Sequence, residues 1–131
     1  MTIKTHWYDN THTTIVTHHS GLWTWEEMHY HDRTEVASMM RNAKCPVAHI
    51  IDMLEAFWSM PGELVANLKL AAEAFHDNEI DVVIFVISDE YMAHLILEAH
   101  RYFGKPGRRY CRATSMEEAL ALVADCRAGV G

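Results

Sequence analysis

Histidine is the residue of this sequence that most readily offers chemistry, because an imidazole can bind a metal ion or carry a proton. The chain has ten, but the spacing argues against the nearest pairs. His18 and His19 are adjacent in a predicted strand and point to opposite faces, and His29 and His31 diverge by roughly 200° on a predicted helix. One aligned row remains, at i, i+4 and i+8: Glu27, His31 and Glu35. Such a row is commonly a solvated helix face, since metal ligands usually show tighter spacing signatures.

Asp52 is the acidic residue with the best position for a polar role, because it ends a predicted buried strand, where ligands of open α/β sheets gather. Asp52 and Ser88 together also suggest a response-regulator receiver. However, no acidic pair follows the first strand, and no lysine follows the last. The cysteines lack a recognisable activating partner, and the glycines form no phosphate-binding loop: Cys45, Cys111 and Cys126 stand apart in the sequence. We therefore expect no catalytic residues and no cofactor.

An unusual apolar segment, residues 53–60, follows Asp52 at a place where turn residues are expected. Two interpretations stay open. Its side chains either fold back over the core edge or extend the next helix, or else they form an apolar wall opposite Leu22, Trp23 and Trp25. Tryptophan and methionine are favoured in interface cores. The candidate ligand- or partner-binding residues are Trp23, Trp25, Asp52, Phe57, Trp58, Ser59 and Met60.

Composition and charge restrict the class of protein. The 131 residues fit one domain, residues 1–131, and the net charge of −7 leaves no positive footprint for nucleic acid. No apolar run approaches the roughly 20 residues that span a bilayer, and the N-terminus lacks a signal sequence, so we expect no membrane insertion. The odd number of cysteines suggests reduced thiols in the cytoplasm. Protonation of all ten histidines would move the charge from −7 to −7 + 10 = +3, which predicts altered solubility or self-association between about pH 5 and 7.

The order of predicted elements indicates an α/β fold. Two strands come first, at Thr2–Tyr8 and Thr13–His19, and a helix follows from Trp25 to about Ala43. Three strand–helix units complete the chain, with strands at Val47–Met53, Val82–Ile87 and Tyr110–Ala113. Helix caps are expected at Thr24, Ser88 and Ser115. This ββα(βα)₃ order predicts one small mixed sheet, its first pair antiparallel and its later strands parallel, with about four helices.

This element order, together with three segments, resembles the STAS-like (anti-sigma-factor antagonist-like) domain family. The matching segments are Ile15–Gly21 leading into Trp25, Ile50–Asp52 leading into a helix, and Ala113–Leu120. The resemblance implies a regulatory domain that binds a protein, and the wider structural class includes lipid-binding relatives. In phosphorylation-switched members, an Asp-Ser-Ser-Gly-like segment starts the helix after the third strand. Here that region is Trp58–Gly62, and Ser59 is its one hydroxyl.

We therefore expect a non-enzymatic regulatory or protein-interaction domain of STAS-like type, which binds another protein or forms a homodimer. Two alternatives stay open. The same aromatic residues would line a pocket of at least about 300 Å³ if the domain bound a small apolar or lipid-like ligand. A metal-dependent enzyme is the second alternative, and it depends on the row of Glu27, His31 and Glu35.

Overall fold

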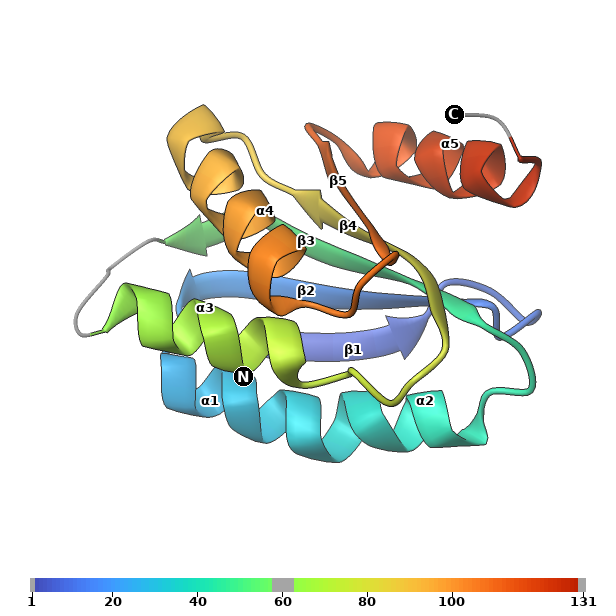
Figure 1. Ribbon diagram of the computed structural model, residues 1–131, viewed down its shortest axis with the longest axis horizontal. Helices are drawn as coiled ribbons and strands as arrows, with labels where there is room; N and C mark the ends of the chain where they lie inside the picture. Colours follow the sequence, from blue (N-terminus) through green and yellow to red (C-terminus); the bar gives the residue numbers. More distant parts are fainter. Residues whose placement is uncertain (1, 58–62, 130–131) are drawn as a thin grey trace.

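A five-stranded mixed sheet forms the centre of the protein in the computed structural model, which describes residues 2–57 and 63–129 (Figure 1). The strands lie side by side in chain order: β1 (Ile3–Trp7), β2 (Thr14–Leu22), β3 (Val47–Phe57), β4 (Ile80–Val86) and β5 (Arg109–Ala113). β1 runs antiparallel to β2, and each later pair of neighbours is parallel. The predicted α/β class and the mixed sheet are therefore confirmed.

The helices follow the predicted order. They are α1 (Trp25–His31), η1 (Asp32–Val36), α2 (Ala37–Asn42), α3 (Leu64–Glu73), α4 (Glu90–Phe103) and α5 (Met116–Arg127). α1, η1 and α2 form the single helix predicted from Trp25 to about Ala43, with one π-helical turn inside it. Counted in this way, the described residues contain four helical units, as expected. None of these helices combines the length and the apolar character needed to cross a membrane.

The helices divide unequally between the two faces of the sheet. α1, α3 and α4 pack on one face, where the core includes Trp23, Met28, Met53, Leu68, Phe85 and Ile96. α5 packs on the opposite face over β3, β4 and β5, through Ala119 and Val123 (Figure 1). Over β1 and the end of β2, that second face carries exposed side chains: Lys4, His6 and Leu22. The sheet therefore has one fully covered face and one that is only partly covered.

β2 and β3 both extend further than the sequence predicts. The segment after Met53 is not a turn but the last part of β3, which pairs with β2 as far as Leu22 and Phe57. The ladder continues because β3 carries one extra residue between Asp52 and Glu55, which shifts the register and restores the pairing beyond it. The apolar side chains that sequence reasoning placed in a connection therefore alternate across a strand.

Two of the three predicted helix caps are confirmed. Thr24 Oγ1 accepts from the Glu27 N–H at 3.0 Å, and Ser115 Oγ accepts from the Glu118 N–H at 3.1 Å. The cap predicted at Ser88 is wrong. Asp89 caps α4 through a 3.0 Å bond from the Met92 N–H, because Ser88 lies in the exit from β4, where its carbonyl accepts from Arg112.

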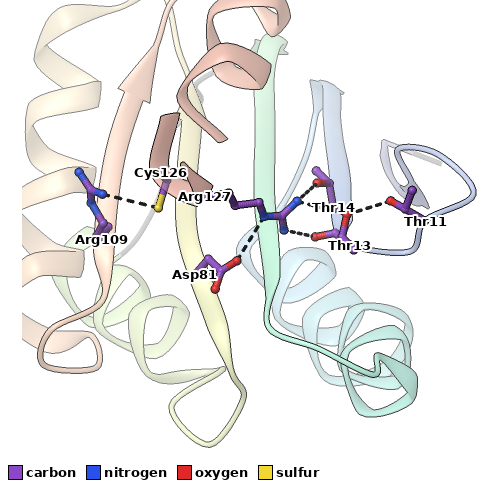
Figure 2. Close-up of polar contacts among 7 residues, drawn as sticks. All are labelled: Thr11, Thr13, Thr14, Asp81, Arg109, Cys126 and Arg127. Carbon is purple, nitrogen blue, oxygen red and sulfur yellow. Dashed lines mark hydrogen bonds and ion pairs between the residues drawn. The ribbon is translucent and has the colours of Figure 1, made fainter. Parts of the chain in front are cut away.

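Arg127 fixes the end of α5 to the start of the sheet (Figure 2). Its guanidinium donates to the carbonyl oxygen of Thr13 at 2.5 Å, to Thr13 Oγ1 at 3.2 Å and to Thr14 Oγ1 at 3.4 Å. Arg127 Nε also lies 3.3 Å from Asp81 Oδ2, which belongs to β4. One side chain thus connects the last helix to β2 and β4, and it holds α5 on the second face of the sheet.

Candidate functional site

Leu22 and Phe57 form an exposed apolar pair at the end of the β2–β3 ladder. They are register partners, and 66% of Leu22 and 65% of Phe57 are exposed. Leu54, at the extra residue of β3, is 41% exposed. We call Leu22, Leu54 and Phe57 the apolar rim. Single exposed apolar side chains are ordinary, but exposed apolar side chains that are register partners at the ends of two neighbouring strands mark a candidate binding surface.

The predicted tryptophans lie on the other face of the sheet. Trp23 is 7% exposed and belongs to the main core, where its ring meets those of His19 and Trp25 edge-on, at 5.1 and 4.8 Å between centroids. Trp25 is half-buried and its ring also stacks on His29. Both tryptophans follow the end of β2 and pack in the core beneath α1, α3 and α4, so the structure separates them from Phe57 on the exposed face.

Asp52 makes two polar contacts. Its Oδ2 accepts from His18 Nδ1 at 2.8 Å, and its Oδ1 accepts from the Leu54 N–H at 3.1 Å. The second bond satisfies a backbone donor at the extra residue of β3, so the carboxylate supports the local break in the ladder. Asp52 thus lies beside the apolar rim, on the sheet face that α5 leaves partly open.

Three of the predicted site residues, Trp58, Ser59 and Met60, lie outside the described residues. The position that would carry a phosphoserine switch falls among them.

A histidine pair next to Asp52 was not predicted from the sequence. His6 Nε2 in β1 lies 3.0 Å from His18 Nε2 in β2. Sequence reasoning compared neighbours within one strand and overlooked the pairing across the hairpin, in which His6 sits opposite Val16, two residues from His18. The available signal was the register of the two strands, since residues at i and j ± 2 of an antiparallel pair share a face.

The row of Glu27, His31 and Glu35 does not form a metal site. Glu27 accepts from Thr2, and His31 Nε2 bonds to Thr5 Oγ1 at 2.5 Å and lies 3.6 Å from Glu35. Within residues 2–57 and 63–129, no group of three or more His, Cys, Asp or Glu side chains could hold a metal ion. The three cysteines, which were expected to be reduced, are free thiols in the structure.

The core beneath α1, α3 and α4 contains a cavity of about 50 Å³. Its lining is mostly apolar, but His19, Asp32, His49 and His100 also face it. Burial lowers the pKa of His19 and of His49 to about 3, and burial raises the pKa of Asp32 to about 7. The volume admits a few water molecules, whereas a drug-sized ligand needs about 300 Å³ or more.

An open hollow of about 310 Å³ lies on the outer side of α1, between Thr24, Glu26, Glu27, Tyr30 and Arg33. Its lining is largely polar and charged, so it does not suit the apolar ligand that the sequence left open. Neither space lies between the Trp23 segment and Phe57 on the exposed face.

The strand order, the antiparallel first pair and the three parallel strand–helix units define a mixed α/β fold. A solved structure of an uncharacterised protein from Shewanella loihica PV-4, of the DUF3478 family and with a SpoIIAA-like fold, is similar to this chain. The TM-score is 0.62 and the sequence identity is 18%, and the match covers 92% of this chain and 90% of the other. This likeness supports the STAS-like fold. No family model matches the chain, and no curated protein does so either.

Proposed function

We propose that this chain is a non-enzymatic regulatory domain of the cytoplasm that acts by binding protein, and that its partner is a second copy of itself. The surface that carries the proposal is the apolar rim, in which Leu22 and Phe57 are register partners with about two thirds of each side chain exposed. Burial of apolar surface drives most protein association, at roughly 25 cal/mol per Å² removed from water. Contact with another apolar surface would remove the exposed leucine–phenylalanine pair from water and so stabilise the association.

The charges beside the rim support a self-complementary contact. Lys4 pairs in register with His18 on one side of β2, and Glu55 pairs with Ser20 on the other side. His18, Ser20 and Leu22 alternate with inward residues, so their partners Lys4, Glu55 and Phe57 lie on the same sheet face. A two-fold axis along β2 would bring Lys4 of one copy toward Glu55 of the other, as an isologous interface requires.

The free thiols support the cytoplasmic part of the proposal, because persistent disulfides mark oxidising compartments. The lipid-like ligand receives less support, since the apolar cavity in the described residues holds about 50 Å³. A pocket for a small ligand would enclose its apolar side chains, whereas the side chains of the apolar rim are exposed. Their exposure therefore favours protein binding over ligand binding.

Sedimentation equilibrium of the full chain tests the proposal. We expect the native protein to form a reversible dimer and the Leu22→Ser, Phe57→Ser double variant to sediment as a monomer with unchanged circular dichroism. Tyr102→Ser is the matched control, because Tyr102 is 82% exposed on α4, away from the rim, and its removal should leave the dimer intact. A native protein that stays monomeric, or a double variant that dimerises as strongly as the native chain, would contradict the proposal.

A further inference from the structure

The hydrogen bonds of His6 and His18 determine how many protons the two rings carry. His6 Nδ1 lies 2.8 Å from the carbonyl oxygen of Trp7, which can only accept, so this nitrogen carries a proton. His18 Nδ1 lies 2.8 Å from Asp52 Oδ2. A carboxylate is a weaker base than an imidazole, so His18 Nδ1 carries the proton of that bond. With Nδ1 protonated, a neutral ring has only a lone pair at Nε2.

The two Nε2 atoms nevertheless face each other at 3.0 Å, which is a hydrogen-bond distance. The rings are nearly parallel, at 17°, and their centroids are 5.1 Å apart, so the nitrogens point toward each other between the rings. A hydrogen bond between them needs a proton on one Nε2, and both rings already carry one at Nδ1. The pair therefore holds three protons on its four nitrogens, one more than two neutral rings hold.

We propose that His6, His18 and Asp52 form a proton-binding site that makes the proposed dimer sensitive to pH. One proton bridges the two rings, and the Asp52 carboxylate balances its charge, so the three side chains together are neutral. Asp52 Oδ1 also accepts from the Leu54 N–H, which holds the carboxylate in place. In acid a fourth proton makes both rings positive, and positive charges on nitrogens 3.0 Å apart repel each other.

The effect on self-association rests on the proposed function, because the proposed contact along β2 covers the pair. In the free chain the ring of His6 is exposed, so it can turn away from a positively charged His18. In the dimer the second copy occupies that space and holds the two charges together. The fourth proton therefore favours the separate chains, and a fall in pH weakens the dimer.

The other charged groups near the pair also act on its protons. Lys4 in β1 is the register partner of His18, and Glu55 in β3 lies on the same sheet face. α5 brings Arg127 to Thr13, at the start of β2. Lys4 and Arg127 add positive charge to this face, whereas Glu55 opposes it, so the Asp52 carboxylate is the acid in direct contact with the pair.

Nitrogen-15 NMR of the histidine rings in the full chain at about pH 7 counts the protons of the pair, whether or not the chain dimerises. In the native protein we expect a proton on each Nδ1 and one shared between the two Nε2 atoms. In Asp52→Asn the amide oxygen keeps the Leu54 N–H, so the amide nitrogen faces His18 Nδ1 and donates to it. We expect this variant to hold two protons on the pair, with none on His18 Nδ1. Two protons on the native pair would overturn the proton-binding site.

Sedimentation equilibrium at about pH 7.5 and about pH 5.5 tests the effect on the dimer, with circular dichroism to confirm the fold at both values. We expect the dissociation constant of the native dimer to rise at least about tenfold in acid, because two unit charges at this distance repel by about that factor even in water. His6→Gln stays polar but gains no charge, so it should lose most of this rise. His94→Gln, at an exposed position of α4, is the matched control and should keep the native rise.

The two experiments separate the failure of the site from the failure of the dimer. A native chain that is monomeric at both pH values would overturn the dimer and its pH dependence together, whereas the proton count would still decide whether the pair binds a proton. A native dimer with the same dissociation constant at both pH values, or a His6→Gln dimer with the native rise, would overturn the pH dependence alone.

Discussion

Thr17 Oγ1 lies 2.9 Å from His49 Nε2 inside the fold, and this contact belongs to a chain of buried polar groups on the covered face of the sheet. Thr17 Oγ1 also lies 3.1 Å from Thr5 Oγ1, which bonds to His31 Nε2. His49 is therefore a packed, hydrogen-bonded histidine of the core. An unpaired buried charge costs several kcal/mol, so burial favours the neutral form of His49 and lowers its pKa.

The buried histidines predict that the protein loses stability in acid. Burial lowers the pKa of His19 and His49 to about 3 and that of His100 to about 4, whereas unfolded histidines titrate near 6.5. Below about pH 6.5 the unfolded chain therefore binds more protons than the folded one, and the free energy of unfolding falls as pH falls toward 3. Each proton that the unfolded chain binds and the folded chain does not changes the free energy of unfolding by about 1.4 kcal/mol per pH unit. Urea unfolding at a series of pH values measures this slope.

His19→Leu isolates one contribution to the acid slope. Within the described residues, neither ring nitrogen of His19 has a hydrogen-bond partner, so an apolar side chain removes the proton uptake without breaking a bond. We expect a shallower loss of stability between about pH 6.5 and 4 than in the native protein. His94→Leu, at an exposed site, should retain the native slope, and identical slopes for His19→Leu and the native chain would contradict the assignment.

The same three histidines correct the charge swing predicted from composition. They stay neutral in the folded protein between about pH 5 and 7, because their pKa values lie at about 3 to 4. The folded chain therefore cannot reach the +3 that all ten protonated histidines would give. Composition counts titratable groups but carries no information on burial, which decides whether they titrate.

Much of the fold follows from the sequence because its signals are local. Apolar runs locate β3 and β4, and Thr24 and Ser115 locate two helix starts, since caps act within one turn. The end of β3 could not be predicted, because the residues from Leu54 to Phe57 are held by pairing with β2 across a shifted register. The contact between His6 and His18 also depends on how β1 pairs with β2. The periodicity of a single helix or strand carries no information on that pairing.

Burial of Asp32 predicts the opposite pH effect, a loss of stability as pH rises from about 4 to 7. Burial raises its pKa to about 7, above the unfolded value of 3.8, so the folded state holds a proton that the unfolded state has lost. The contribution of Asp32 to stability is full below about pH 4 and is lost as pH rises through 7. We expect Asp32→Asn to raise the free energy of unfolding at about pH 8 by about 2 kcal/mol, after allowance for its partial exposure. Asp125→Asn, on the surface of α5, should change little, and an equal effect of both variants would contradict the prediction.

The contacts of Arg127 allow a prediction of how much the attachment of α5 to the sheet contributes to the stability of the protein. Arg127→Met keeps much of the aliphatic stem but removes the bonds to Thr13 and Thr14 and the ion pair with Asp81. We expect a loss of about 1 to 3 kcal/mol in urea unfolding, because the guanidinium bonds are charge-assisted and partly buried. Arg41→Met, at an exposed position of α2, is the control and should cost under about 0.5 kcal/mol. If both variants unfold alike, Arg127 does not hold the helix.

We predict that position 104, where α4 ends, requires glycine for steric reasons. Its backbone dihedral is ordinary, with φ at −76°, so the need for glycine comes from crowding. A Cβ at this position would overlap the Tyr110 hydroxyl oxygen and the His100 carbonyl oxygen, and the carbonyl cannot move without disturbing the last turn of α4. We expect Gly104→Ala to cost more than about 2 kcal/mol in thermal or urea unfolding, because overpacking displaces backbone.

Gly107 provides the comparison that separates crowding from backbone conformation. It adopts a φ of +84° with open space around the Cβ position, so Gly107→Ala pays a conformational cost of about 1 kcal/mol and meets no atom. The predicted order of stability is native, then Gly107→Ala, then Gly104→Ala. Replacing Tyr110 by Phe in the Gly104→Ala background should recover part of the loss, because the hydroxyl oxygen is one of the three atoms in the way, with the His100 carbonyl oxygen and Tyr110 Cζ. A Gly104→Ala protein as stable as Gly107→Ala would show that the end of α4 can relax around the added methyl group.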